Sequence, residues 1–260
     1  MEHGICLLGL IPVRAEPDDR SEMTTQIIFG ECYTVLEKQG IWARIITSYD
    51  QYEGWIDKKQ IIYISKQFHK VATTNYGISL EKIFPVHSRS RKTKFLIPTG
   101  SSFPGIDESI FLINTEEFQF NGRYLPPGHK TEKNTIIAAA KDFLNAPYLW
   151  GGRTHMGIDC SGFTQIVYKL IGISIQRDTS QQAEQGETIN FLSEAEPGDL
   201  LFFDNDEEII VHTGILMEDN KIIHASGHVR IDNIDHYGIY KKEDKTYTHQ
   251  LRLIKRTVSD

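Results

Sequence analysis

One cysteine and two histidines in the second half of the chain are of the types that carry nucleophilic catalysis. Cys160 directly follows Asp159 at the end of a glycine-rich stretch, and His212 and His224 lie in two apolar runs further along the chain. A thiolate nucleophile needs a base within hydrogen-bond reach, and the base needs a third group to orient it. Acyl transfer is the chemistry that such a set would perform.

A helix is expected to begin at this cysteine. Asp159 is a favoured N-cap type, and Gly172 stands where helices often end. The residues that recur at helical spacing between them are apolar: Phe163, Ile166, Val167, Leu170 and Ile171. Cys160 would then lie in the first turn, where unpaired N–H groups and the helix dipole favour a thiolate. The alternative is a buried structural cysteine that packs as a small hydrophobe.

The two histidines are predicted to lie on one β-hairpin. The β-rich runs are residues 209–217 and 221–226, separated by the turn-forming residues 218–220. A three-residue loop would put His212 and His224 on the same face as diagonal neighbours, with His224 opposite Gly214. A two-residue loop would put them on opposite faces, because a slip of one residue reverses a side chain. The catalytic interpretation therefore requires the three-residue loop.

The composition is typical of a soluble enzyme. The chain has 260 residues, enough to bury at least one core, and a formal net charge of −7. Nucleic acid and anionic membrane surfaces favour a basic face, so neither is an expected partner. The sequence has no run of about 18 apolar residues, and residues 1–3 lack the basic start of a secretion signal. If Met1 is the natural start, a cytoplasmic location is expected.

The three cysteines lie far apart and do not indicate a disulfide framework. Cys6 and Cys32 lie in apolar, strand-like runs and are interpreted as structural. Zinc held by Cys160 and the two histidines is an alternative, because these residue types are zinc ligands. The position behind Asp159 at a helix start favours a nucleophile, so no metal and no other cofactor is expected.

The pattern predicts an all-β first half and a mixed second half. Short strands separated by turn-forming residues are expected at 26–29, 33–36, 41–47 and 54–56, a spacing typical of a small barrel. Further strands are expected at 95–97 and 110–113. Residues 125–128 are typical of a linker, and a helix is expected within 131–144. The predicted domains are 1–65, 66–128 and 129–260.

The motifs around Cys160 and the histidines together resemble the NlpC-type cell-wall cysteine peptidases, a papain-like family. They follow the family's order within residues 135–255, as Pro-Tyr-Leu-Trp-Gly-Gly at 147–152, Asp-Cys-Ser-Gly at 159–162, Arg-Asp-Thr-Ser-Gln-Gln at 177–182, Pro-Gly-Asp-Leu at 197–200, His-Thr-Gly-Ile at 212–215 and Ile-His-Ala at 223–225. The resemblance implies an α+β papain-like domain with Cys160 as nucleophile, His212 as general base and acid, and His224 orienting His212. It also implies that Tyr148 lies near the nucleophile and helps to hold the oxyanion.

Residues 5–65 resemble a bacterial SH3-like domain, through 13–17, 30–31, 40–42 and 52–56. Residues 66–128 are interpreted as a second, diverged SH3-like or β domain. All-β SH3-like barrels before an NlpC-type domain resemble the YkfC-type γ-D-glutamyl-L-diamino-acid endopeptidases. The resemblance implies an enzyme of murein recycling that hydrolyses peptidoglycan stem peptides, L-Ala-γ-D-Glu-diamino acid, with a free N-terminal amine. A monomer is expected.

The ammonium group of such a peptide needs a negative partner, since a buried cation must be paired. Asp159, beside the nucleophile, is the candidate. By the resemblance, Ser161 and Ser180 also line this subsite. The first SH3-like domain closes it with a glutamate and a tyrosine, which are assigned to Glu22 and Tyr52. Arg153 is a further candidate, facing a substrate carboxylate.

Two alternatives remain open. Another papain-like enzyme, such as a wall amidase or an acyltransferase, would share the Cys-His-His set, which does not specify the acyl donor or acceptor. The other is a non-catalytic wall-binding protein built from SH3-like modules. The presence of Cys160, His212 and His224 argues against it.

Overall fold

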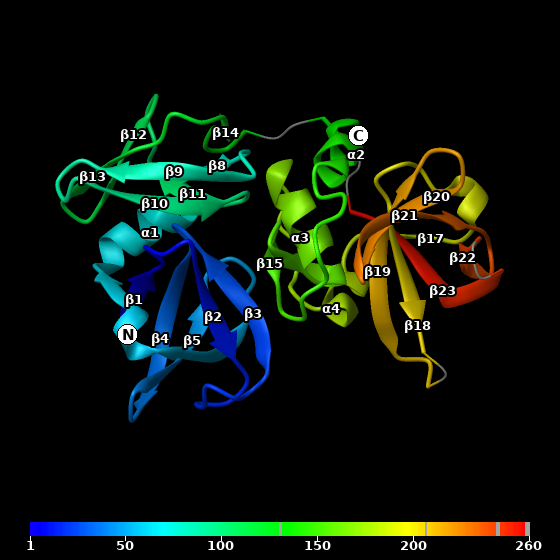
Figure 1. Cartoon of the computed structure of the whole chain (residues 1–260), viewed down its shortest axis with the longest axis horizontal. Helices are drawn as coiled ribbons and strands as arrows, with labels where there is room; N and C mark the ends of the chain where they lie inside the picture. The colour runs from blue at the N-terminus through cyan, green and yellow to red at the C-terminus, as the bar shows by residue number, and fades with distance from the viewer. Residues whose placement is uncertain (130–131, 206, 243–244, 258–260) are drawn as a thin grey trace. The chain divides into compact units, whose positions relative to one another are not determined.

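The computed structural model of the chain describes residues 1–129, 132–205, 207–242 and 245–257 (Figure 1). The chain forms two compact units, residues 1–130 and 131–260. The division lies two residues beyond Gly128, the end of the linker expected from the sequence. Within the described ranges, none of the helices is long and apolar enough to cross a membrane.

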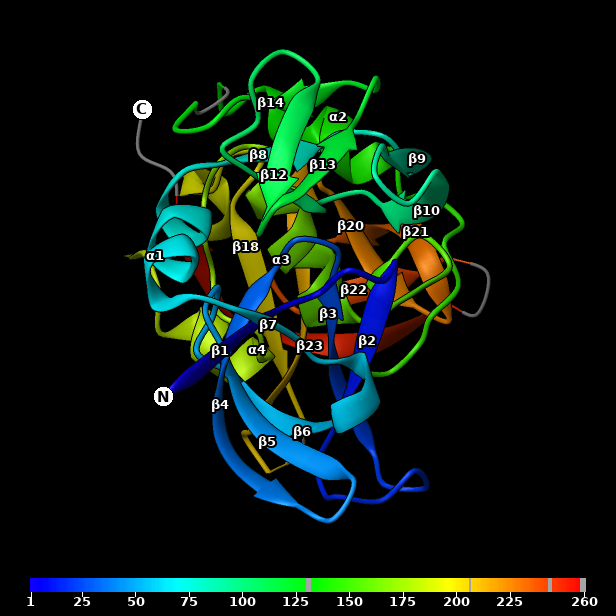
Figure 2. The ribbon, with the colours of Figure 1, turned by 90° about the vertical axis from the view of Figure 1, so that its left-hand side faces the viewer.

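A curved antiparallel sheet forms the first part of the N-terminal unit, and Figure 2 shows its strands β4, β5 and β6 side by side. The strand order is β3-β2-β6-β5-β4-β1-β7. The strands are β1 (Glu2–Ile5), β2 (Leu10–Arg14), β3 (Met23–Ile28), β4 (Cys32–Gln39), β5 (Trp42–Thr47), β6 (Glu53–Asp57) and β7 (Ile62–Ile64), with the 3₁₀ turn η1 (Lys58–Gln60) before β7. The four strands expected here correspond to β3 to β6, and Gly40, with φ of +55°, makes the tight turn between β4 and β5.

A helix and two small sheets complete this unit. The helix α1 (Lys66–Thr74) begins after Ser65, whose hydroxyl caps the N–H of Phe68. One sheet has the order β10-β9-β13-β12 and the other β11-β8-β14. Their strands are β8 (Tyr76–Ser79), β9 (Ile83–Ser88), β10 (Thr93–Pro98), β11 (Ser102–Pro104), β12 (Ile110–Ile113), β13 (Glu116–Gln119) and β14 (Tyr124–Leu125).

The two parts of the N-terminal unit share an apolar core. Phe29, from the end of the first sheet, packs edge-on against Phe111 and Phe118, with ring centroids 6.2 and 6.1 Å apart. Leu7 and Phe103 belong to the same buried cluster. The predicted boundary at residue 65 therefore runs through a common core, and the interpretation of residues 66–128 as a diverged barrel stays a prediction.

The C-terminal unit places its helices before its main sheet. The helices and the small ribbon are α2 (Thr135–Lys141), β15 (Arg153–Thr154), β16 (Gly157–Ile158), α3 (Cys160–Leu170) and α4 (Thr179–Ala183). The sheet strands are β17 (Glu187–Ile189), β18 (Leu200–Asp204), β19 (Ile210–Met217), β20 (Lys221–Ser226), β21 (His228–Ile234), β22 (Gly238–Lys241) and β23 (Thr246–Arg256), with the 3₁₀ turn η2 (Leu192–Glu194) after β17. Of the helix expected within 131–144, only α2 forms, and residue 131 lies outside the described residues.

The main sheet of this unit closes on itself. Strand β23 pairs with β18 and also with β22, so the strands from β18 to β23 form a closed antiparallel set with β17 outside it. Leu201, Phe203, Leu216 and Ile222 belong to its buried cluster. Strand β19 is buried along most of its length because α3 and α4 pack against it, and Figure 1 shows it beside these helices.

Helix α3 packs against β19 and carries the candidate nucleophile at its first residue. Its start at Cys160 and its end before Gly172, which has φ of +81°, agree with the sequence prediction. The helix is buried on all sides rather than on one stripe. A polar side chain inside it finds a partner, since Gln165 donates to the carbonyl of Ile175 at 3.2 Å.

Candidate active site

Asp159 joins the start of α3 to the glycine-rich approach loop. Its carboxylate caps the helix by accepting a hydrogen bond from the N–H of Gly162 at 2.6 Å, and it accepts another from Gly151 at 2.8 Å. A side chain at position 162 would have no room, because its Cβ would lie 2.3 Å from the carbonyl oxygen of Gly152. The loop and the helix start are thus held together directly beside Cys160.

A buried arginine balances the charge of Asp159. The guanidinium of Arg177 donates to both oxygens of Asp159, at 2.5 and 3.1 Å, and to the hydroxyl of Ser161 at 2.7 Å. The Arg177 side chain is 1% exposed, and this two-pronged geometry is the one that arginine forms best with a carboxylate. The role of Asp159 as partner of a substrate amine stays a prediction, in a position where its charge is already paired.

Strands β19 and β20 form the hairpin that the catalytic interpretation requires. The loop spans residues 218–220, and Gly214 lies opposite His224, as predicted. A Cβ at position 214 would lie 2.8 Å from the Cβ of His224, so only glycine leaves room for this pair. His212 Nε2 lies 2.8 Å from His224 Nδ1. The predicted register is confirmed.

The thiol of Cys160 contacts the backbone of β19, the strand that carries His212. The backbone of Thr213, the residue after His212, hydrogen-bonds to the thiol. On the other side, the hydroxyl of Thr179 at the start of α4 is 3.8 Å from the sulfur. Because His212 uses Nε2 for His224, its Nδ1 is the nitrogen left for proton exchange with a thiol.

Burial keeps the thiol and the imidazole neutral. Burial and the neighbouring Asp159 raise the pKa of Cys160 to about 11, against the opposing effects of Thr179, Thr213 and Arg177. Burial, with the charges of His224 and His249, holds the pKa of His212 well below its usual value. The thiolate expected from the helix dipole is therefore opposed by desolvation, which outweighs it. This pair is suited to proton transfer during attack on a substrate.

Tyr148 is held at the edge of this site. Its N–H donates to the carbonyl of Gly227, in the turn after β20, at 3.0 Å. Burial, the Cys160 sulfur and Asp159 raise the pKa of Tyr148 to about 12. The hydroxyl therefore keeps its proton at neutral pH and can donate a hydrogen bond, while 36% of the residue stays exposed.

The remaining predicted substrate residues lie in different surroundings. Ser161 is buried beside Asp159, whereas Ser180 is exposed on α4, one residue after Thr179. Arg153 is buried in β15, and its positive charge repels that of Arg177. Glu22 and Tyr52 belong to the N-terminal unit, where Glu22 is exposed and Tyr52 is half-buried. The substrate contacts assigned to these residues stay predictions.

Sequence reasoning gave no role to several residues that the structure brings beside this set. His249 on β23 stacks on His212 with ring centroids 4.2 Å apart, and burial lowers the pKa of His249 to about 4. Asp232 on β21 lies 3.0 Å from His224 Nε2. Arg177 and Thr179 were part of a matched motif without a stated role. The sequence contained a signal only for Arg177 and Thr179. His249 and Asp232 gave none, because β21 and β23 have the alternating polar residues of any half-exposed strand.

The geometry disfavours the zinc alternative. In the part of the chain that the structure describes, no group of three or more His, Cys, Asp and Glu side chains is arranged to hold a metal ion. His224 uses Nδ1 for His212 and Nε2 for Asp232, so neither of its nitrogens is left for a metal. His212, His224 and Asp232 instead form a hydrogen-bonded series of side chains.

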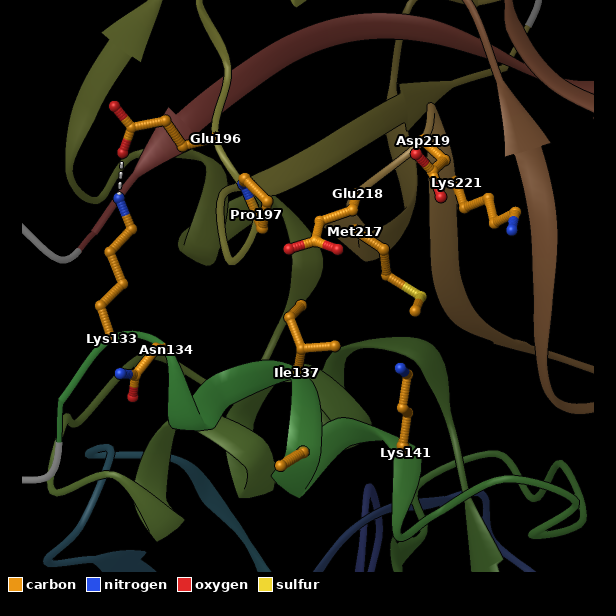
Figure 3. A pocket seen from close by; sticks show the side chains of 11 residues that line it. Lys133, Asn134, Ile137, Lys141, Glu196, Pro197, Met217, Glu218, Asp219 and Lys221 are labelled. Carbon is orange, nitrogen blue, oxygen red and sulfur yellow. Dashed lines mark hydrogen bonds and ion pairs between the residues drawn. The ribbon is translucent and has the colours of Figure 1, made fainter.

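A separate cavity of about 730 Å³ lies at the far end of the β19–β20 hairpin (Figure 3). It is lined by α2 and the hairpin loop, including Ile137, Lys141 and Met217. Lys133 at its rim pairs with Glu196 at 2.5 Å. Along an extended strand, Met217 lies about 17 Å from His212, so this cavity is distinct from the candidate site.

Similarity to known proteins identifies the family. Residues 145–251 match the NlpC/P60 family, and residues 13–61 match the bacterial dipeptidyl-peptidase Sh3 domain. The chain is 31% identical over 217 residues to the gamma-D-glutamyl-L-lysine dipeptidyl-peptidase of Bacillus subtilis (strain 168), a match that covers 77% of this chain and 71% of the relative. The chain belongs to the NlpC/P60 family. It is a cysteine endopeptidase with an SH3 domain, so the predicted enzyme class is confirmed.

Two further comparisons also cover most of the chain. A gamma-D-glutamyl-L-lysine dipeptidyl-peptidase of Bacillus cereus (strain ATCC 10987) is 26% identical, with 79% of this chain and 68% of the relative covered. The crystal structure of an NlpC/P60 family protein from Bacillus cereus ATCC 10987 superposes with a TM-score of 0.83 at 18% identity, covering 99% of this chain and 100% of that one. The predicted fold class, an NlpC-type domain after all-β SH3-like modules, is confirmed.

Proposed function

We propose that this NlpC/P60 chain cleaves the bond between γ-D-glutamate and the following L-diamino acid in peptidoglycan stem peptides, with Cys160 as nucleophile. The observation that carries the proposal is the pair of imidazoles, His212 and His224, which lie 2.8 Å apart. The backbone of Thr213, next to His212, hydrogen-bonds to the buried Cys160 thiol. Two relatives named gamma-D-glutamyl-L-lysine dipeptidyl-peptidases, each matching more than three quarters of this chain, support the choice of bond.

The first half of the reaction forms a thioester. His212 Nδ1 takes the thiol proton as the sulfur of Cys160 attacks the γ-carbonyl carbon of D-glutamate. The electron pair of the carbonyl moves to its oxygen, which accepts hydrogen bonds from the Cys160 N–H and from the Tyr148 hydroxyl. His212 then gives its proton to the leaving amine, the C–N bond breaks, and the diamino acid departs.

The second half restores the enzyme. His212 takes a proton from water as the water oxygen attacks the thioester carbon, and the same oxyanion contacts hold the second intermediate. The C–S bond breaks, the dipeptide leaves with a new carboxylate, and the sulfur regains its proton. In both halves of the reaction, His224 holds His212 by the hydrogen bond between His224 Nδ1 and His212 Nε2. None of these steps needs a cofactor.

The free amine of the peptide is the proposed specificity determinant. The Asp159–Arg177 pair carries no net charge, so a substrate ammonium needs a second anion as well as Asp159. Glu22 of the SH3 domain is the proposed source of that charge. Tyr52 and the two serines, Ser161 and Ser180, are proposed to complete the subsite, and Arg153 to favour the substrate carboxylate.

A preference for free amines would suit an enzyme of murein recycling, because the intact wall presents stem peptides whose alanine amine is blocked. We propose this role for the chain, as a monomer acting in the cytoplasm on released peptides. An enzyme that binds an ammonium group discriminates against polymeric wall, and this discrimination supports the recycling role. Cell fractionation and the mass of the protein in solution test the location and the monomer directly.

The test of the cleavage site is mass spectrometry of the products from two tripeptides. L-Ala-γ-D-Glu-L-diamino acid is expected to yield L-Ala-γ-D-Glu and the free diamino acid. The same tripeptide with an acetylated amine is expected to react at least about 100-fold more slowly, because a site built for a charged group rejects an analogue that lacks that group.

The outcomes separate the proposal from its rivals. Equal cleavage of both tripeptides, or of intact peptidoglycan as readily as the free tripeptide, would contradict the recycling role. Cleavage between a muramyl group and L-alanine would indicate a wall amidase. Transfer of the dipeptide to an added amine in preference to water would indicate an acyltransferase. The absence of any reaction would indicate a wall-binding protein.

A further inference from the structure

The hydrogen-bonded chain that begins at His212 continues beyond His224. His224 Nε2 lies 3.0 Å from Oδ2 of Asp232, and Arg230 donates to the other oxygen, Oδ1, at 2.7 Å. The side chains of His224 and Asp232 are 1% and 11% exposed. Little water therefore competes for these contacts, and a buried hydrogen bond is stronger than one in water.

Strand pairing places Asp232 in this position. In the register of β20 and β21, Asp232 lies opposite Ile222, and Arg230 lies opposite His224. Asp232 is thus the diagonal neighbour of His224, within reach of a long side chain on the same face. The chain from His212 to Asp232 crosses three adjacent strands, β19, β20 and β21, of one closed sheet.

We propose that Asp232 is a positioning residue that fixes which nitrogen of the catalytic histidine carries the proton, an inference that rests on the function proposed above. Asp232 touches neither the thiol nor the peptide in this account. It acts through His224, and its effect falls on the chemical step rather than on substrate binding.

The hydrogen-bond donors and acceptors along this series of side chains fix the position of each proton. A carboxylate only accepts hydrogen bonds, so Nε2 of His224 must carry the proton that faces Asp232. A neutral His224 then has a lone pair on Nδ1, which accepts from Nε2–H of His212. This leaves the lone pair of a neutral His212 on Nδ1, the nitrogen that takes the thiol proton.

Arg230 holds Asp232 in the required state. Burial opposes ionisation of the carboxyl, but hydrogen bonds from His224 and Arg230 hold the pKa of Asp232 below its usual value. Since Arg230 occupies Oδ1, Oδ2 is the oxygen left for His224. Arg230 thereby fixes the orientation of the carboxylate as well as its charge.

The sharpest substitution is Asp232→Asn, which keeps the shape and changes one acceptor into a donor. Arg230 needs an acceptor, so the amide oxygen should turn toward Arg230 and the NH₂ group toward His224 Nε2. The proton of His224 must then move to Nδ1, and that of His212 to its own Nδ1, where it cannot accept from the thiol. We expect kcat on the free tripeptide to fall at least about 10-fold, with KM within about 2-fold, as wrong-tautomer variants of other hydrolases show.

A double variant tests the direction of the effect. In Arg230→Ala combined with Asp232→Asn, the amide oxygen is free to face His224, so part of the lost kcat should return. The matched control is Asp235→Asn, because the Asp235 carboxylate accepts from the Tyr247 hydroxyl at 2.6 Å and contacts neither histidine. The control is expected to retain the full kcat.

A second readout needs no turnover. The ¹⁵N chemical shifts of labelled histidine are expected to show the His224 proton on Nε2 in the wild-type protein and on Nδ1 in Asp232→Asn. An unchanged kcat, or a lower kcat with an unchanged tautomer, would overturn the role of Asp232. A Cys160→Ala protein that still cleaved the tripeptide would overturn the proposed function instead, and the shifts would still report on Asp232.

Discussion

The chemistry at the scale of residues depends on a thiol and an imidazole that are both buried. Burial raises the pKa of Cys160 to about 11 and lowers that of His212, so the neutral pair is favoured over the ion pair at neutral pH. His212 is then ready to accept a proton without first losing one. Tyr148, with its pKa raised to about 12, supplies a donor that stays protonated.

This state predicts an unusual pH profile for cleavage of the free tripeptide. The base must be neutral, and the pKa of His212 is lowered, so kcat/KM should stay nearly constant as the pH falls through 6.5. The alkaline limb should lie near the pKa of the substrate amine, about 8, because the proposed subsite binds its charged form. The measurement is kcat/KM from pH 5 to 9.

The variant His249→Phe keeps an aromatic ring stacked on His212 and distinguishes the titration of His212 from that of His249. The pKa of His249 is lowered to about 4, so His249 is not the base that titrates near pH 6.5. Burial is the largest cause of the lowered pKa of His212, so His249→Phe, which keeps His212 covered, should still show a nearly constant kcat/KM through pH 6.5. An acid limb with its midpoint at 6.5 or above would contradict the buried-base account.

At the scale of elements, the hairpin of β19 and β20 is what makes two histidines a pair. Its register leaves only a hydrogen atom at Gly214 opposite His224. In Gly214→Ala, the new Cβ would lie 2.7 Å from the Ile222 side chain and 2.8 Å from the Cβ of His224, so the strands must separate. We expect a loss of about 1–3 kcal/mol in unfolding free energy and a fall in kcat, measured by thermal unfolding and tripeptide cleavage.

The control for this prediction adds a methyl group elsewhere on β19. Val211 is 47% exposed, so Val211→Ile has room for the extra carbon and should keep both stability and kcat. If Gly214→Ala were as stable and active as Val211→Ile, the close pairing of Gly214 with His224 would not be what sets the geometry of the histidines.

The sequence predicted the elements whose signals are local. The helix at Cys160 followed from its cap and apolar spacing, and the hairpin followed from counting residues across one loop. Asp232 had no such signal, because its contact with His224 depends on the pairing of a third strand, β21. Likewise, the apolar spacing of α3 gave no signal that Gln165 and Lys169 are buried as well, because the packing of other elements buries them.

At the scale of the whole molecule, an SH3 domain and an NlpC/P60 domain occur in one chain, and a relative that is 31% identical matches 77% of its length. The sequence identified both from ordered motifs. It did not reveal that residues on both sides of position 65 share a core, because the contact of Phe29 with Phe111 and Phe118 joins segments more than 80 residues apart. The role of Glu22 and Tyr52 in substrate choice is a prediction at this scale.

The central claim is that Cys160 is the nucleophile of a peptidase that cuts after γ-D-glutamate. The most direct measurement is the rate at which wild-type and Cys160→Ala proteins release the diamino acid from L-Ala-γ-D-Glu-L-diamino acid, with Cys6→Ala as the matched cysteine control. The account predicts release by the wild type and by the control, provided that the control is folded, and a loss of about 10⁴-fold or more in Cys160→Ala. Release by Cys160→Ala at a rate close to that of the wild type would contradict the account.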